Sequence, residues 1–198
     1  MKTVSALVIV DVQNDFCPGG SLPVTDGGEV AAALNVYISV FKKAGHAIYA
    51  TRDWHPSKTV HFREQGGKWP PHCVQGTHGA KFHPALKLPH DTVIITKGAG
   101  KDEDSYSGFQ GKDAGGRGLA EALRAQGVTR IFVGGLATDY CVKETVIDAI
   151  REGFEVCLLT DAVKGVDISP GDSIRAIETM RENGALTATL RDFKTAQT

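Results

Sequence analysis

Six short apolar runs, rich in β-branched residues, recur along the chain and alternate with segments of helical spacing. The runs are ALVIV (6–10), AIYAT (47–51), TVIIT (92–96), RIFVG (130–134), EVCLLT (155–160) and ALTATL (185–190). Short continuous runs of this kind are typical of strands buried on both faces of a parallel sheet. Helical apolar spacing occupies 28–43, 118–126, 138–152 and 171–181. The alternation predicts a doubly wound α/β fold, with a mostly parallel six-stranded sheet and helices on both faces.

One connection breaks this alternation. Residues 53–91 are rich in Pro and Gly and hold six of the seven histidines. Connections this long without regular structure are uncommon in compact domains and are usually functional. A chain of 198 residues fits one domain. We therefore predict a single domain over 1–198, with a metal-binding loop excursion at about 53–91.

Charge and composition narrow the choice of partners. The formal net charge is −1, so no overall field attracts nucleic acid or an anionic membrane surface, and a small neutral ligand is the simpler expectation. The first apolar run passes directly into Asp11, with no cleavage site and no apolar stretch near ~18 residues. The four cysteines form no C-x-x-C pair. We expect a cytoplasmic protein whose thiols stay reduced.

Polar residues follow the predicted strands where each strand ends. They are Asp11 after the first strand, Asp53 after the second, Lys97 after the third, the turn 134–141 after the fourth and Asp161 after the fifth. Ligands of open α/β sheets bind beyond the carboxyl ends of the strands. The sequence therefore predicts that carboxylates, an ammonium and a thiol meet at one edge of the sheet.

Cys141 lies where the helix after the fourth strand begins. Unpaired N–H groups and the helix dipole favour an anion there, so we expect a depressed thiol pKa and donors for a substrate oxyanion. Asp11 could take the thiol proton and pass it to a leaving amine, while Lys97 holds both anions in place. Two alternatives stay open: an inert buried cysteine and a structural Asp11–Lys97 salt bridge.

The excursion also carries a candidate metal site. Asp53 and His55 lie two residues apart at a strand end, and a further histidine such as His72 would complete a set of two imidazoles and one carboxylate. His61 is an additional candidate, and Cys73 beside His72 stays open as a thiolate ligand. Zn, Fe(II) and Mn(II) all accept such ligands. The alternative is a group of solvated loop histidines.

Three aromatic residues lie in predicted loops rather than in the periodic segments. Phe16, Trp69 and Tyr106 could wall a pocket for a flat ligand. The alternative for each of them is ordinary packing.

Several motifs occur together and in one order. They are IVDVQNDFCPGGSLPV, ATRDWHP followed by HF, WPPHC, ITKG, DSYSGF and VGGLATDYCVKETVIDA. Over about 5–190, this pattern resembles the nicotinamidase (pyrazinamidase) branch of the isochorismatase-like hydrolases.

The resemblance implies roles for individual residues. The catalytic residues would be Cys141 as nucleophile, Asp11 as general base and then acid, and Lys97 as the third member of the triad. The metal ligands would be Asp53, His55 and His72, with His61 as a fourth ligand in some members of the family. A cis peptide bond would join Leu136 to Ala137, and the amides of Ala137 and Cys141 would form the oxyanion hole. The ring of the substrate would be walled by Phe16, Leu22, Trp69 and Tyr106.

The resemblance also implies an activity. Such an enzyme converts nicotinamide to nicotinate and ammonia, and also accepts pyrazinamide, through a cysteine thioester. One divalent metal ion, zinc first and iron or manganese as alternatives, would coordinate the ring nitrogen of the substrate. The resemblance suggests a place in NAD salvage and leaves a homo-oligomer open.

Other functions fit the motifs less completely. Another small-amide or ureido hydrolase of the same superfamily is the nearest. The isochorismate branch lacks the metal set and the cysteine that DWH, PPH and DYC supply. A dinucleotide-binding module should show G-x-G-x-x-G after the first strand, and DVQNDFCPGG is not that pattern. A metal-binding scaffold without catalysis would not depend on Cys141.

Overall fold

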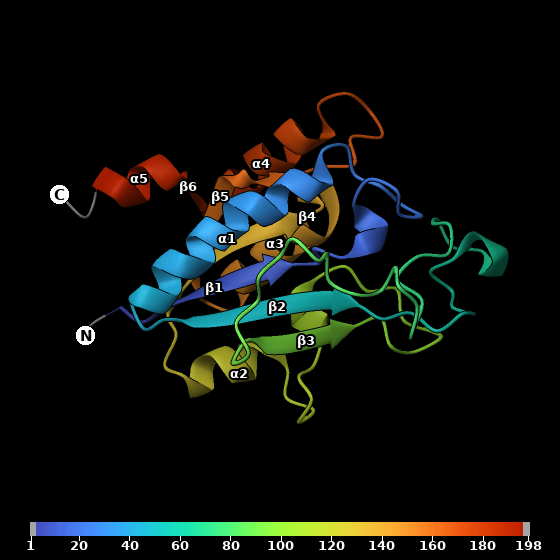
Figure 1. The fold of residues 1–198 in the computed structure, drawn as a ribbon, viewed down its shortest axis with the longest axis horizontal. Helices are drawn as coiled ribbons and strands as arrows, with labels where there is room; N and C mark the ends of the chain where they lie inside the picture. The colour runs from blue at the N-terminus through green and yellow to red at the C-terminus, as the bar shows by residue number, and fades with distance from the viewer. Residues whose placement is uncertain (1–2, 196–198) are drawn as a thin grey trace.

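The computed structural model describes residues 3–195, and its centre is one six-stranded sheet (Figure 1). The strands are β1 (Ser5–Val10), β2 (Ala47–Asp53), β3 (Val93–Lys97), β4 (Arg130–Leu136), β5 (Glu155–Lys164) and β6 (Leu186–Ala188). Their order is β3-β2-β1-β4-β5-β6, and every pairing is parallel. The predicted doubly wound α/β fold is confirmed.

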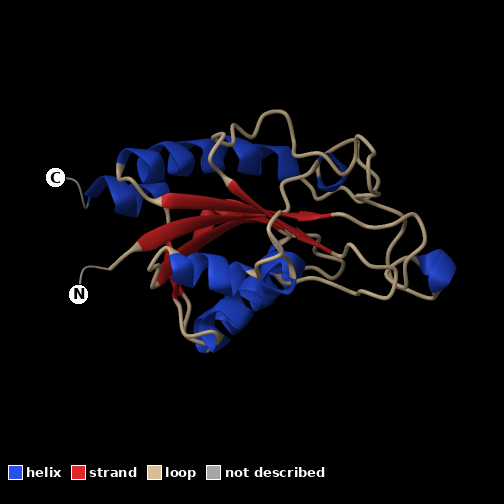
Figure 2. Cartoon of the chain, turned by 90° about the horizontal axis from the view of Figure 1, so that it is seen from below, coloured by secondary structure: helices blue, strands red, loops and turns tan. Residues whose placement is uncertain are grey.

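Helices cover both faces of the sheet (Figure 2). They are α1 (Gly27–Lys43), α2 (Leu119–Ala125), α3 (Lys143–Arg151), α4 (Asp172–Glu182) and α5 (Leu190–Thr195). Short helical turns are η1 (Asn14–Phe16), η2 (Arg63–Gln65), η3 (Gly108–Gln110) and η4 (Thr138–Val142). The sequence did not predict α5, η1, η2 or η3, because segments of three to six residues are too short to show a 3.6-residue period, whereas η4 lies within the predicted helical segment 138–152. No helix among residues 3–195 is both long enough and apolar enough to span a bilayer.

The central strand β1 shows why its sequence is continuously apolar. All six of its residues are buried. Ala6, Val8 and Val10 pack into the core that contains α2, α3 and α4, whereas Leu7 and Ile9 pack into the core that contains α1. Burying one such aliphatic side chain stabilises a fold by about 1.5–3 kcal/mol. A polar residue at any of these positions would therefore weaken one of the two cores.

The strand order places a crevice between β1 and β4. The chain leaves β1 toward α1 on one face and leaves β4 toward α3 on the other, so β1 and β4 form the switch point of the sheet. In open α/β sheets, ligands bind beyond the carboxyl ends of the strands at this point. The first part of the excursion after β2 lies beyond the same ends of the strands, and its last part runs back across the sheet to the start of β3 (Figure 1).

Candidate active site

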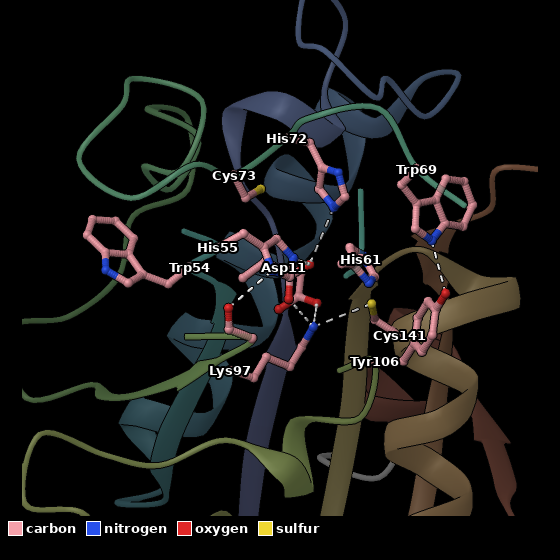
Figure 3. A network of polar contacts seen from close by, with 12 residues as sticks. Asp11, Trp54, His55, His61, Trp69, His72, Cys73, Lys97, Tyr106 and Cys141 are labelled. Carbon is pink, nitrogen blue, oxygen red and sulfur yellow. Dashed lines mark hydrogen bonds and ion pairs between the residues drawn. The ribbon is translucent and has the colours of Figure 1, made fainter. Parts of the chain in front are cut away.

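Three of the predicted catalytic side chains meet at the switch point (Figure 3). Asp11 directly follows β1, Lys97 ends β3, and Cys141 lies in η4. The Lys97 Nζ is 2.9 Å from Asp11 Oδ2 and 3.6 Å from Cys141 Sγ. All three side chains are buried. The tertiary structure therefore assembles a carboxylate, an ammonium and a thiol from three separate strand ends.

The ammonium holds this cluster together electrostatically. Lys97 also forms an ion pair with Asp53. Burial by itself would lower the pKa of Lys97, but the carboxylates of Asp11 and Asp53 raise that pKa well above its ordinary value. Burial raises the pKa of Asp11, which also accepts a 2.6 Å hydrogen bond from Thr51 Oγ1. Although burial opposes it, Lys97 and His55 hold the pKa of Asp53 below its ordinary value.

The expectation of a depressed pKa for Cys141 is wrong in this structure. Burial raises the pKa of the thiol well above its ordinary value, with Lys97 opposing and the carboxylates of Asp11 and Asp53 adding to the rise. Loss of water therefore outweighs the helix N-terminus and the single nearby cation. The thiol is protonated at rest, so it needs a base as it attacks.

A single helical turn, η4, places Cys141 in this cluster. The amide of Val142 donates to the carbonyl of Ala137 at 3.1 Å, five residues back, which makes η4 one wide helical turn before α3. The peptide bond between Leu136 and Ala137 is cis, as the resemblance implies. Just before it, Gly135 has φ +133°, and a Cβ at Gly135 would lie 2.1 Å from the carbonyl oxygen of Val10. Only glycine fits this close approach of β4 to its neighbour β1.

Four predicted metal ligands converge beside the catalytic cluster. The histidines His55, His61 and His72 each offer a nitrogen, and these nitrogens lie within 4.8 Å of one another. Asp53 Oδ2 is 3.6 Å from His55 Nε2 and 4.0 Å from His72 Nε2. All four side chains are buried, which is unusual for a histidine cluster without a ligand to hold.

Hydrogen bonds at the outer side of each ring orient these histidines. The partners of the Nδ1 atoms are Gly98 O for His55 (3.1 Å), Pro70 O for His72 (2.8 Å) and a carboxylate oxygen of Asp104 for His61. Each bond leaves Nε2 facing inward, and the buried Nε2 of His55 has no hydrogen-bond partner among the described residues. Burial lowers the pKa of His72 to about 4, so its ring is neutral and able to coordinate. These donors fit a divalent metal ion of the zinc, iron or manganese type.

Two residues that support the metal site, Gln13 and Gly98, were not predicted from the sequence. The side-chain amide of Gln13 accepts from the backbone N–H of Asp53 at 2.7 Å and donates to its carbonyl at 2.8 Å, so it fixes the ligand's backbone. Gly98 has φ +64°, and a Cβ there would lie 2.4 Å from His55 Cε1. Gln13 lies two positions after Asp11, and Gly98 lies one position after Lys97. Their closeness to these predicted strand-end residues was the only sequence signal for them.

One cavity joins the catalytic and metal-site residues. It is lined by Phe16, Leu22, Asp53, His61, Trp69, His72, Tyr106, Ala137, Tyr140, Cys141 and Val166. All four predicted wall residues are therefore present. Trp69 Nε1 donates to the hydroxyl of Tyr106 at 3.0 Å, which locks two of the aromatic walls together.

Two further wall residues, Tyr140 and Val166, were not predicted. Tyr140 lies in η4, where its ring meets Trp69 edge-on at 4.9 Å between centroids. The amide of Val166 donates to the buried carboxylate of Asp139 at 2.9 Å. The two residues of the first contact are 71 positions apart in the sequence and those of the second are 27 apart, so no local sequence pattern predicts either contact.

Other sequence candidates lie away from the site. Asp161 was expected at the carboxyl edge, and this is wrong: β5 continues to Lys164 through a register shift against β4. Asp161 instead accepts hydrogen bonds from Tyr37 Oη at 2.6 Å and from the amide of Leu190 at 2.8 Å. Cys73 is buried but is not among the converging donors of the described residues, and burial raises its pKa well above the ordinary value.

The chain is similar to known proteins over most of its length. The isochorismatase domain matches residues 5–192. The chain is 44% identical to nicotinamidase/pyrazinamidase of Mycobacterium tuberculosis, over 89% of this chain and 94% of the relative. It is 39% identical to nicotinamidase of Escherichia coli, over 97% and 98% of the two chains.

Solved structures with the same fold include two that match most of the chain. The pyrazinamidase of Pyrococcus horikoshii in complex with zinc superposes with a TM-score of 0.86 at 49% identity, covering 93% of this chain and 98% of that chain. PnC1 from L. infantum in complex with nicotinate superposes with a TM-score of 0.85 at 36% identity, covering 96% and 94%. The chain belongs to the isochorismatase family and, within it, to the nicotinamidase/pyrazinamidase group.

Proposed function

We propose that the protein hydrolyses nicotinamide to nicotinate and ammonia, and pyrazinamide by the same route. The observation that carries the proposal is that Cys141 and the metal-site residues Asp53, His61 and His72 line one small cavity. A flat aromatic amide could place its ring against the metal site and its carboxamide against the thiol at the same time. The relatives named nicotinamidase support the same substrate class.

Binding would rest on the aromatic walls and the metal site. Phe16, Trp69 and Tyr106 offer apolar surfaces to a flat ring. Asp53, His55 and His72 would hold the metal ion, which when bound supplies a Lewis-acid position for the ring nitrogen and so orients the substrate. Orientation of this kind can contribute about 7–11 kcal/mol toward lowering a barrier.

The first chemical step uses the catalytic cluster. As Cys141 Sγ bonds to the carboxamide carbon, its proton passes to Asp11, because the buried thiol is neutral at rest. The carbonyl π electrons move to the oxygen. The backbone N–H groups of Ala137 and Cys141 donate hydrogen bonds to this oxyanion and so form the oxyanion hole. Asp11 then returns the proton to the leaving nitrogen, ammonia departs, and a thioester remains.

The second step regenerates the thiol. Asp11 takes a proton from a water molecule as its oxygen bonds to the thioester carbon. The carbon–sulfur bond then breaks, Asp11 returns the proton to the Cys141 sulfur, and the released acid loses its carboxyl proton to solvent as nicotinate. Lys97 stays charged throughout, since Asp11 and Asp53 raise its pKa. Its ammonium would offset the negative charge that moves between the carboxylate and the sulfur.

We further propose that residues 1–198 work as one domain with 53–91 as its metal-binding loop, since three of the four converging donors lie inside that excursion and Asp53 begins it. A cytoplasmic role in NAD salvage is consistent with four unpaired cysteines and a pyridine carboxylate product.

Ammonia release from nicotinamide by the purified protein tests the activity. We expect release by the wild type and none by Cys141→Ala, with unchanged circular dichroism. Cys157→Ala is the matched control, because Cys157 is a buried thiol in β5 that does not line the cavity. Release by Cys141→Ala at the wild-type rate would overturn the thioester route.

Chelation tests the metal and the substrate assignment together. Protein stripped with a chelator should lose substrate binding, and one of Zn, Mn or Fe(II) should restore it. If the folded, metal-loaded protein releases no ammonia from nicotinamide, the substrate assignment fails, and ureido compounds and other small amides should be screened next.

A further inference from the structure

Asp104 lies outside the catalytic cluster but contacts one of the converging histidines. It belongs to the loop between β3 and η3, and its carboxylate oxygen pairs with Nδ1 of His61. The side chain of Asp104 is 59% exposed, whereas that of His61 is 3% exposed. A surface carboxylate thus reaches the outer edge of a buried ring.

His61 differs from the other two histidines in the nature of this partner. The Nδ1 atoms of His55 and His72 pair with backbone carbonyls, which the fold supplies whatever the side chains are. His61 depends on a side chain that one substitution removes. No other residue of the described chain pairs with its ring nitrogens in a hydrogen bond or ion pair.

The pairing decides which nitrogen of His61 faces inward with a lone pair. If Nδ1 carries the proton and donates it to Asp104, Nε2 is unprotonated and available to a metal ion. The ring stacks on His55 at 4.6 Å between centroids and meets His72 at 5.3 Å. One nitrogen from each of the three rings lies within 4.8 Å of the others, and with Nδ1 paired to Asp104 the nitrogen left for the metal ion is Nε2. A carboxylate partner also makes the imidazole a stronger ligand.

We infer that Asp104 is a positioning residue that commits His61 Nε2 to the metal ion, as a fourth protein ligand beside Asp53, His55 and His72. This inference rests on the metal site of the proposed function. Loss of an outer-shell partner of this kind typically lowers metal affinity by about 10- to 100-fold.

Metal affinity of the full chain tests the inference without any assay of turnover. Zinc binding is measured by competition with a chromophoric chelator for the wild type, Asp104→Ala and Asp104→Asn. We expect Asp104→Ala to weaken binding by about 10- to 100-fold and Asp104→Asn to fall between, because an amide oxygen still accepts the Nδ1 proton without the full charge.

Asp102→Ala is the matched control. Asp102 is an exposed carboxylate of the same loop with no hydrogen bond or ion pair to the residues described, and its removal changes the net charge by the same amount. Equal weakening by Asp102→Ala and Asp104→Ala would overturn the inference in favour of a general charge effect.

A second readout follows His61 itself. In Co(II)-loaded protein, the visible absorption of Asp104→Ala should move toward that of His61→Ala, because both would lose the same ligand. His55→Ala distinguishes failure of the Asp104 role from failure of the metal site itself. If His55→Ala loses metal while Asp104→Ala and His61→Ala bind it as the wild type does, the role of Asp104 is wrong and the metal site stands. If His55→Ala also binds normally, the metal site of the proposed function fails as well.

Discussion

At the scale of single residues, the site depends on charges that would be costly to bury alone. Lys97 ends a strand and is enclosed by Asp11, Asp53 and the sulfur of Cys141. If the ammonium of Lys97 were removed, the carboxylates of Asp11 and Asp53 would be left beside each other in a site without bulk water. A buried ion cluster of this kind is destabilised strongly when one partner is removed.

Lys97→Met should therefore lower the free energy of unfolding of the metal-free protein by about 3–5 kcal/mol. Arg124→Met, which breaks an ion pair with Glu152 whose side chains are 54% and 42% exposed, should cost less than about 1 kcal/mol. Urea unfolding of the two variants makes the comparison. Equal losses would show that the Lys97 cluster behaves as a surface pair.

Thiol reactivity provides a residue-scale test of burial. Burial raises the pKa values of Cys17 and Cys157 to about 11. At pH 8 only about one thiol in a thousand is then ionised, and the thiolate is the reactive form.

In a Cys141→Ala variant, alkylation of Cys17 and Cys157 should still rise about tenfold from pH 9 to 10, because the thiolate fraction is still increasing there. In urea the same rates should level off in that interval. Mass spectrometry of labelled peptides distinguishes the cases, and a plateau at pH 9 in the native protein would contradict the raised pKa values.

At the scale of elements, the position of Cys141 depends on how β4 lies against β1 and continues into η4. Gly135 lies against the carbonyl of Val10, and the next few residues form the turn that carries Cys141. Thr145 Oγ1 donates to the carbonyl of Cys141 at 2.6 Å and accepts from the amide of Gly108 at 2.9 Å, which ties α3 to η3. The turn is thereby fixed at both ends.

Gly135→Ala should disturb this close approach of β4 to β1 and cost more than about 3 kcal/mol of stability, because the new Cβ would overlap backbone that cannot move independently. Gly153→Ala is the control: Gly153 also has positive φ, at +84°, but nothing lies within 4 Å of the added carbon. It should cost about 1 kcal/mol and leave ammonia release unchanged. Thermal unfolding and the ammonia assay test both variants. A Gly135→Ala protein as stable and active as Gly153→Ala would refute the argument.

At the scale of the whole molecule, the donors of the metal site join distant segments. Asp53 ends β2, while His55, His61 and His72 lie along the excursion that follows it. A bound ion would link the excursion to the sheet. It would also favour the folded state, because the unfolded chain does not hold these donors together.

Adding zinc to metal-free protein at about 100 times its dissociation constant should stabilise the fold by about 2.7 kcal/mol. For a chain of this size that corresponds to a rise in Tm of about 5–11 °C. His55→Ala should show little or no rise, since one ligand is gone. Differential scanning calorimetry with and without zinc makes the measurement. An equal rise in His55→Ala would place the stabilising ion elsewhere.

Much of this architecture could be predicted from local patterns. Continuous apolar runs such as that of β1 identify strands buried on both faces, because each face needs an apolar side chain at every second position. The strand-end residues Asp11, Asp53 and Lys97 could be predicted too, since parallel strands all end at the same edge. The cysteine and histidine motifs then identified the family.

Properties that depend on surroundings could not be predicted in this way. The pKa of Cys141 is raised because water is excluded from it by several segments, and exclusion of water has no local signature in sequence. Asp161 lies away from the site because a register shift between β4 and β5 lets β5 continue past it. The contacts of Tyr140, Val166 and Asp104 form only when segments distant in the sequence come together in the folded chain.

The amino-acid sequence by itself thus determined the strand and helix pattern, the family and the chemical groups available at the carboxyl edge. The tertiary structure decided which of those groups meet, which are charged, and which residues such as Gln13 and Asp104 hold them in place. The physical reason is range. Periodicity and turn chemistry act over a few neighbouring residues, whereas solvent exclusion and side-chain pairing act between segments that become neighbours only after the sheet has formed.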